Sequence, residues 1–152
     1  DIERRSTSYS KTIVLPSTTR NQKIFGNIFD ISVENDYDEN DVTCDYMDLT
    51  EVFNEFNSRI SKYDNVTHIR KISDDAINEL KDLKVDLVYI DGLHTYDQVK
   101  TDIVNYLPII NESGFICGHD YHMVWQGVVN AIHEKLGKPD KIFQDTSWIK
   151  KI

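Results

Sequence analysis

Cysteine, proline, glycine and positive charge are all scarce in this sequence. Its 152 residues include 2 cysteines, 3 prolines and 6 glycines, and 17 basic residues stand against 26 acidic ones, which gives a net charge of -9. Two cysteines make no disulfide framework, and they lack the CxxC spacing of a structural metal site. A chain without clustered positive charge also lacks the electrostatic footprint of a nucleic-acid-binding protein. We therefore expect free thiols and no nucleic-acid partner.

Long apolar runs are absent as well. No run approaches the roughly 20 residues that a membrane-spanning helix needs, and the first residues lack the basic and apolar regions of a secretory signal. These absences predict a soluble, cytoplasmic protein with no membrane partner. The length of 152 residues and the hydrophobic content of 39% suit a single domain over residues 1–152 with one core.

Short continuous apolar runs alternate along the chain with segments of helical periodicity. The runs lie at residues 23–30, 66–69, 85–90 and 115–117. Such alternation is typical of βαβ units around a buried parallel sheet. The segments 141–143 and 147–152 predict an antiparallel hairpin at the carboxyl-terminal edge of that sheet. The expected fold class is therefore α/β, with a doubly wound and mostly parallel sheet.

Four helices are predicted from apolar side chains that recur at three- and four-residue steps. Ser73 is expected to cap the second helix, and Gly137 to end the fourth. Residues 111–114 are expected to form a turn, and the acidic loop 32–45 is either a lid or a solvated surface loop. The four apolar stripes are Leu49, Val52, Phe53, Phe56 and Ile60; Ala76, Ile77, Leu80 and Leu83; Val99, Ile103, Tyr106, Leu107 and Ile110; and Val124, Val128, Ile132 and Leu136.

Ionisable side chains gather directly after two of the predicted strands. Because right-handed βαβ units place the carboxyl ends of their strands at one sheet edge, these side chains should meet there, together with Asp30. Oxygen ligands favour magnesium or manganese, and histidines shift the choice toward manganese, iron or zinc. Asp-Gly and His-Asp pairs also form ordinary turns, so both interpretations stay open. The residues concerned are Asp91, His94 and Asp97, and then His119, Asp120 and His122.

Two histidines of this group are candidate general bases. Imidazole titrates near neutrality, so His94 or His122 could take a proton from a hydroxyl group; the alternative is a solvated loop histidine. Tyr121 and Trp125 follow in the same region, where their rings could stack on a substrate or seal the sheet edge. Asp30 ends a strand where nucleotide-binding sheets often place an acid against ribose hydroxyls.

The segment VDLVYIDGLHTYDQVKTDIVNYLPIINESGFICGHDYHMVWQGVVNAI, residues 85–132, resembles the class I S-adenosylmethionine-dependent methyltransferases. The similarity is greatest to the branch with macrocin-type and other sugar O-methyltransferases. The resemblance implies a Rossmann-like methyltransferase fold and methyl transfer to a hydroxyl group of a sugar or another small hydroxylated metabolite. It rests on Asp91-Gly92-x-His94-x-Tyr96, Asp102, Gly114-Phe115, Gly118-His119-Asp120-Tyr121, and Gly127-Val128 before Ala131.

The resemblance also implies roles for individual residues. The metal-binding acids of the family match Asp91, His119 and Asp120, with magnesium or manganese as the ion, and His119 stands where an acid is commoner. Asp91, His94 and His122 become the catalytic candidates. S-adenosylmethionine would be bound by Glu3, Asp30, Ser73, Asp74 and Asp91, with Asp30 at the ribose and Ser73-Asp74 at the adenine.

The start of the chain departs from the family pattern. Laid without gaps, Glu3 matches an acid that precedes a glycine-rich turn, but Arg5 and Tyr9 occupy the two glycine positions, where a Cβ could block the cofactor. Residues 12–15 would then continue the family's first helix, and the first strand would be almost wholly missing. A fragment of a longer protein, a diverged amino-terminal part and a different local structure all stay open.

Two other functions are compatible with these residues. A missing central strand would expose its neighbours, so a second copy of the chain or another protein is a candidate partner. One alternative function is a non-catalytic binding or assembly module of the same fold, because Arg5 and Tyr9 replace the two glycines. A metal-dependent hydrolase or oxygenase is the other alternative, because metal ligands do not define a reaction.

Overall fold

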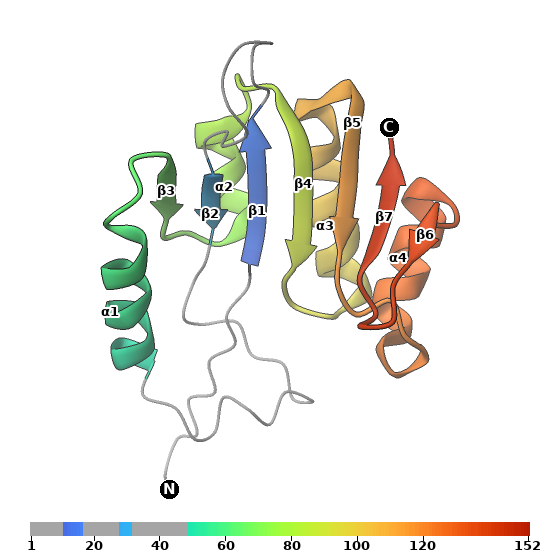
Figure 1. The fold of residues 1–152 in the computed structure, drawn as a ribbon. Coiled ribbons are helices and arrows are strands. Elements are labelled where there is room, and N and C mark those ends of the chain that lie inside the picture. Colours follow the sequence, from blue (N-terminus) through green and yellow to red (C-terminus); the bar gives the residue numbers. More distant parts are fainter. Residues whose placement is uncertain (1–10, 17–27, 32–48) are drawn as a thin grey trace, which may run out of the picture.

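The computed structural model describes residues 11–16, 28–31 and 49–152, and in that part of the chain seven strands form one sheet (Figure 1). The order of strands across the sheet is β3-β2-β1-β4-β5-β7-β6. The strands are β1 (Lys11–Pro16), β2 (Ile28–Ile31), β3 (Val66–Ile69), β4 (Val85–Asp91), β5 (Ile110–Gly118), β6 (Lys141–Ile142) and β7 (Trp148–Lys151). The helices are α1 (Leu49–Ile60), α2 (Ser73–Leu80), α3 (Tyr96–Tyr106) and α4 (Gln126–Leu136), with short 3-10 helices η2 (Leu107–Ile109) and η3 (Met123–Trp125).

Five of the seven strands run in one direction, namely β2, β3, β4, β5 and β6. β2 pairs parallel to β3, and β4 pairs parallel to β5, while β1 is antiparallel to both β2 and β4. The carboxyl ends of β2, β3, β4 and β5 therefore share one edge of the sheet, as the sequence predicts. β7 is antiparallel to β5 and to β6, which confirms the predicted edge hairpin.

The central strand β1 is a correction to the expectation from the sequence. Residues 12–15, expected to continue a helix, lie instead in a strand whose residues Lys11 and Leu15 pair with Asp91 and Leu87 of β4. The run Thr-Ile-Val is β-branched and suits a strand, and this strand satisfies the ladder groups of β2 and β4 that a helix would leave unpaired. The amino end of β1, not its carboxyl end, consequently faces the edge where β4 ends.

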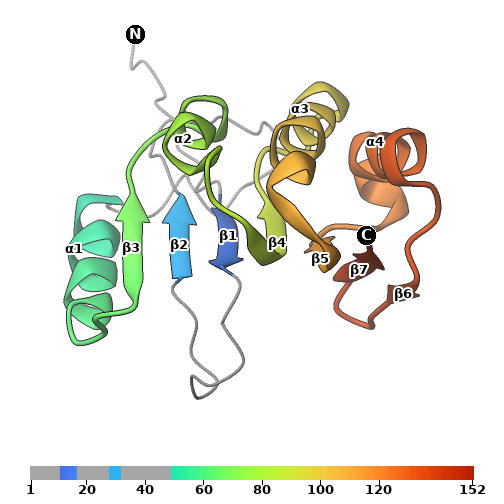
Figure 2. The same ribbon diagram turned by 90° about the horizontal axis from the view of Figure 1, so that it is seen from above.

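The described helices lie mainly on one face of the sheet, and α1 lies near the edge strand β3 (Figure 2). α2, α3 and α4 lie side by side on one face (Figure 2), over a core that includes the fully buried Val88 and Ile116. α1 reaches the other face, because its Phe56 packs edge-on against the ring of His68 at 5.1 Å, and His68 alternates along β3 with the buried Ile69. The apolar layers thus hold the strand ends in fixed positions.

Several local predictions are wrong. α3 ends at Tyr106, so Leu107 and Ile110, which the sequence predicts to continue its apolar stripe, lie instead in η2 and β5. Ile72, not Ser73, is the N-cap of α2 and makes no side-chain capping bond; Ser73 is the first helical residue. Val124 is 72% exposed on η3, outside the buried stripe of α4, because the helix begins only at Gln126. Residues 111–114 belong to β5 and not to a separate turn, and the pairing with β4 is irregular there, between Ile110 and Phe115.

Other predictions stand or lie outside the described residues. Gly137 ends α4 as expected, with a φ of 73° that favours glycine. Within the described part of the chain, no helix has the length and apolar character needed to cross a membrane. Glu3, Arg5, Tyr9 and the acidic loop 32–45 lie in segments that the structure does not describe.

Candidate active site

The loop between β4 and α3 carries the first half of the site. Asp91 is the last residue of β4, and His94 follows in the loop just before α3 begins. Thr95 caps α3, because its side-chain oxygen accepts a hydrogen bond from the backbone N–H of Gln98 at 3.3 Å. The cap fixes where the loop ends and therefore where His94 stands.

The second half of the site comes from the end of β5. Asp120 has a φ of 60°, in the left-handed region that an aspartate adopts more readily than most residues. The backbone N–H groups on either side of this turn are held, since His119 donates to the carbonyl of Ile90 at 3.1 Å and Tyr121 to that of Thr146 at 3.0 Å. The sharp turn is thus fixed by β4 and by the turn between β6 and β7, and it brings Asp120 toward His94.

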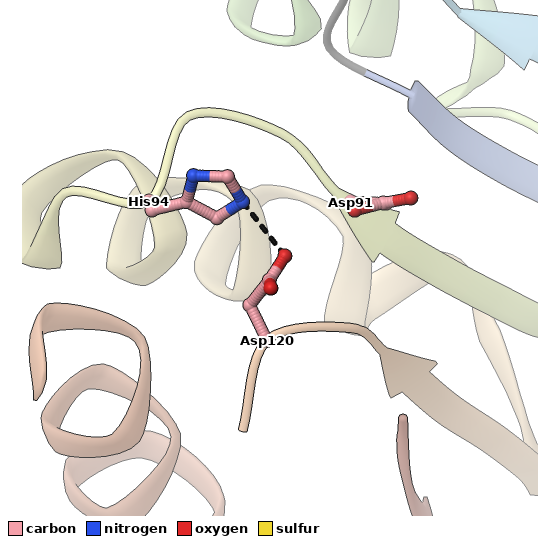
Figure 3. A group of neighbouring side chains, drawn as sticks. All are labelled: Asp91, His94 and Asp120. Atoms are coloured by element: carbon pink, nitrogen blue, oxygen red, sulfur yellow. Dashed lines mark hydrogen bonds and ion pairs between the residues drawn. The ribbon is translucent and has the colours of Figure 1, made fainter. Parts of the chain in front are cut away.

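His94 and Asp120 form the closest pair of the site (Figure 3). Nε2 of His94 lies 2.7 Å from Oδ2 of Asp120, and Nδ1 of His119 lies 3.2 Å from the same oxygen. Burial raises the pKa of Asp120, but the hydrogen bonds and charges of His94 and His119 outweigh it and hold that pKa below its usual value. Asp120 is therefore a carboxylate at neutral pH, and the hydrogen of the shared bond belongs to Nε2.

Trp125 fixes the plane of the His94 ring. The two rings stack with centroids 4.1 Å apart and an interplanar angle of 29°. The sequence suggests Trp125 as a stacking surface for a substrate, but the face toward His94 is already covered. The bond of Nε2 to Asp120 and the stacking on Trp125 together fix the orientation of the imidazole.

Asp91, His94 and Asp120 converge on one point. Each offers a donor atom, and these three atoms lie within 4.8 Å of one another. Ligands of a single ion, each about 2.0–2.6 Å from it, keep similar separations. Two carboxylates and one imidazole are also ligand types that manganese and zinc accept. The residues present therefore fit a divalent cation.

A small cavity beside this group has a volume of about 10 Å³, which is close to the space of one water molecule. It suits a water molecule or an ion and is far too small for a nucleoside. Apolar side chains close one side of it, and the buried Trp148 donates its indole N–H to the carbonyl of His119 at 3.2 Å. The cavity is lined by Ile90, Asp91, Gly92, His94, Val99, His119, Asp120, Val128 and Trp148.

The other predicted site residues lie around this centre. His122 is exposed, and its Nδ1 accepts a hydrogen bond from the backbone of Val124 at 3.3 Å, so it acts as a local cap. Ser73 and Asp74 begin α2 after β3, and Asp30 lies on β2 opposite Ile13 and His68. Asp30 thus lies near the carboxyl end of β2, and Ser73 and Asp74 follow the carboxyl end of β3, at the same sheet edge as Asp91.

Sequence reasoning missed two residues that position the site. The sequence around Trp148 predicts only an edge strand, and nothing local signals its bond to the end of β5. Gln98 contacts both Ser73 and Asp74 across the gap between α3 and α2. Its four-residue spacing from Asp102 is a weak signal, since such pairs share a helix face, but the partners on α2 depend on the packing of two helices.

Comparison with known proteins places the chain in a family. The profile of the methyltransferase domain family matches residues 19–121, more than half of the chain. The chain belongs to the methyltransferase domain family. This confirms the membership that the motifs between Asp91 and Tyr121 predicted.

A known structure supports the fold. The apo structure of CalS11, a TDP-rhamnose 3'-O-methyltransferase of calicheamicin biosynthesis, aligns with a TM-score of 0.50 at 13% identity over 68% of this chain. The O-methyltransferase NovP aligns with a TM-score of 0.49 at 15% identity over 72% of this chain. At these identities the likeness to CalS11 concerns the fold, and it confirms the predicted Rossmann-like methyltransferase architecture.

The chain spans about half the length of these relatives, 49% of CalS11 and 46% of NovP. An uncharacterized protein, y4gI of Sinorhizobium fredii, is 33% identical over 64 residues, which are 38% of this chain and 7% of that protein. The match to each known protein thus covers a part of it.

Proposed function

We propose that this domain catalyses O-methylation of a sugar or another small hydroxylated metabolite, with S-adenosylmethionine as the methyl donor. The observation that carries the proposal is the pairing of His94 with Asp120 beside Asp91, at the sheet edge where a methyltransferase domain places its ligands. Membership of the family favours methyl transfer over the hydrolase or oxygenase alternative. No described feature of the site supports that alternative independently.

S-adenosylmethionine supplies an electrophilic methyl group on a sulfonium sulfur when it is bound. For the nucleophile, His94 accepts the proton of the acceptor hydroxyl at Nδ1 while Nε2–H stays bonded to Asp120. The O–H bond breaks, the oxygen keeps the electron pair, and the carboxylate of Asp120 stabilises the imidazolium that forms. Asp30 at the ribose, Ser73 and Asp74 at the adenine, and Glu3 and Asp91 toward the methionine part complete the proposed cofactor site.

A divalent cation, magnesium or manganese, would supply positive charge to the acceptor oxygen when bound. We assign it to Asp91, His119 and Asp120, as the family pattern implies. His94 lies close enough to be a nitrogen ligand in place of His119. Replacing His94 and His119 in separate variants distinguishes the two assignments. Manganese binding should weaken only in the variant that has lost the histidine ligand.

The test is a calorimetric titration with S-adenosylhomocysteine, with and without magnesium or manganese. We expect micromolar binding, and Asp91→Asn should abolish turnover with a hydroxylated acceptor found by screening sugars and glycosides. Exposed Asp97→Asn serves as the control and should leave turnover unchanged. Methyl transfer that survives Asp91→Asn would contradict the site assignment.

One observation favours a second function, a non-catalytic binding or assembly module. β1 runs antiparallel to β4, so its carboxyl end lies at the edge opposite the candidate site. A parallel first strand would instead deliver the loop after it to the cofactor. A folded chain that binds no S-adenosylhomocysteine, with or without metal, would favour this second function.

A further inference from the structure

Three side chains of α3 converge on the first turn of α2. Gln98, Asp102 and Tyr106 recur every four residues and therefore share one face of α3. Nε2 of Gln98 donates to Oγ of Ser73 at 3.2 Å, to Oδ1 of Asp74 at 3.3 Å and to Oδ1 of Asp102 at 3.2 Å. The hydroxyl of Tyr106 donates to the backbone carbonyl of Ser73 at 2.8 Å. We call these three side chains the polar stripe of α3, and the stripe holds the start of α2 in place.

The stripe is buried at its base and open at its tip. Asp102 is 1% exposed and Tyr106 is fully buried, whereas Asp74 is exposed. Burial, followed by the charges of Asp102 and Asp74, raises the pKa of Tyr106, so its hydroxyl stays a donor. Tyr106 and Asp102 therefore form the buried part of the polar stripe, and Gln98 is the residue of the stripe that contacts the carboxylate of Asp74.

Gln98, in the first turn of α3, also contacts the end of the loop that carries His94. Its backbone N–H bonds the Thr95 cap, and Thr95 follows His94 directly. One residue consequently ties the turn after β3 to the loop after β4. Loss of the Gln98 side-chain amide would free the Asp74 carboxylate to change its rotamer, while Tyr106 would still hold the backbone of α2 at Ser73.

We propose that Gln98 is a positioning residue that orients the carboxylate of Asp74 to accept a hydrogen bond from the 6-amino group of the cofactor's adenine. This inference rests on the proposed function, in which Ser73 and Asp74 contact that ring. A fixed carboxylate favours an amino group at this position and repels the oxygen of a 6-oxo purine. Gln98 would therefore set base selectivity without touching the base.

The experiment compares two probes on the full chain, S-adenosylhomocysteine and S-inosylhomocysteine, which carries a 6-oxo group. Calorimetry should show the wild type preferring the adenine probe at least about tenfold. Gln98→Met keeps the length of the side chain but has no donor, and it should lower this preference to below about threefold. Gln126→Met is the matched control, because Gln126 makes a comparable bond to Asn130 at 2.8 Å on α4.

A double-mutant cycle with Asp74→Asn separates positioning from general weakening. If Gln98 acts through Asp74, Gln98→Met should not change the preference further in the Asp74→Asn background. If Gln98 has only a structural role, Gln98→Met should weaken the binding of both probes equally and leave the ratio of their affinities as in the wild type. That result would overturn the inference. Gln98→Ala provides the same comparison if Gln98→Met does not fold.

Failure of the proposed function gives a different result. A folded wild type that binds neither probe would refute the cofactor site itself and the role of Gln98 with it. Wild-type binding with a preference that Gln98→Met and Gln98→Ala both retain would refute only the role of Gln98.

Discussion

Asp120 shows how one backbone angle places a functional side chain. Its φ of 60° turns the chain away from β5 and sets its carboxylate 2.7 Å from Nε2 of His94. Conformations of this kind persist where the surrounding structure fixes them, and they concentrate at functional sites. Here the bond of His119 to β4 and the bond of Tyr121 to the turn between β6 and β7 supply that constraint. The His94–Asp120 pair is therefore a product of local strain held by the sheet.

The two histidines proposed as bases should differ sharply in activity. His94→Gln removes the imidazole that Asp120 orients and should lower the rate of methyl transfer at least about 100-fold. His122→Gln changes only an exposed cap and should cost less than about threefold. Steady-state rates with the same acceptor, on variants whose circular dichroism matches the wild type, make the comparison. Equal losses in the two variants would contradict the role of His94.

Cys117 should be inert in the folded protein. It is 7% exposed, its thiol donates to the carbonyl of Val88 at 3.3 Å, and burial raises the pKa of this thiol to about 12. A raised thiol pKa leaves little thiolate at pH 8, and the thiolate is the reactive form. Alkylation by iodoacetamide at pH 8 should be at least about 100-fold slower in the native state than in urea.

Peptide mass spectrometry over time follows Cys117 separately from Cys44. The native rate should keep rising as the pH is raised above 9, because more of the thiol ionises. A native rate at pH 8 equal to the rate in urea would contradict the burial of this side chain.

At the scale of elements, the loop after β4 depends on its contact with α4. A Cβ built on Gly127 would lie 2.7 Å from the backbone N of Tyr96 and 2.9 Å from the carbonyl O of His94. Contacts this short force the backbone to move. The close approach explains why a glycine stands at this position of α4, and it links the first turn of α4 to the placement of His94.

Gly127→Ala should therefore destabilise the fold by about 1–3 kcal/mol, the usual cost of overpacking. At an unconstrained helix position the same change would stabilise the protein by up to about 1 kcal/mol. Urea unfolding gives the free energy, and the rate of methyl transfer should fall as His94 shifts. Asn130→Ala, at an exposed site on α4, should stay within about 0.5 kcal/mol of the wild type. Stabilisation by Gly127→Ala would refute the close contact.

At the scale of the whole molecule, β1 differs in direction from the strands on either side of it. β1 lies between β2 and β4 in the seven-stranded sheet and is antiparallel to both, so a central strand of the sheet is not parallel to its neighbours. The strand fills the ladder of β4, whose residues Val88 and Ile90 lie in the core. The pairing therefore protects the strand from which the candidate active site begins.

The register of β1 predicts a distinct set of cross-strand contacts. Backbone nuclear Overhauser effects should join Thr12 to Ile90 and Val14 to Val88, the residues that the sheet pairs. A helix over 12–15 would instead give contacts between residues three apart within that segment. The second pattern, without the first, would contradict the position of β1.

The sequence by itself determined the α/β class, the edge hairpin and the sheet edge that carries the candidate site. These features follow from local periodicity and from the fixed hand of βαβ units, which any buried parallel sheet shares. The motifs after β4 and β5 also predicted the family. The residue types and positions of Asp91, His94 and Asp120 therefore suffice to single them out as candidates.

Only the tertiary structure decided how these candidates pair and which strand lies at the centre. The run of residues 12–15 has both helical and strand potential, and the open ladders of β2 and β4 settle it in favour of a strand. The separation of His94 from Asp120 is 26 residues along the chain, and that of Gln98 from Ser73 is 25. Contacts over such separations depend on how whole elements pack, and no local pattern encodes them.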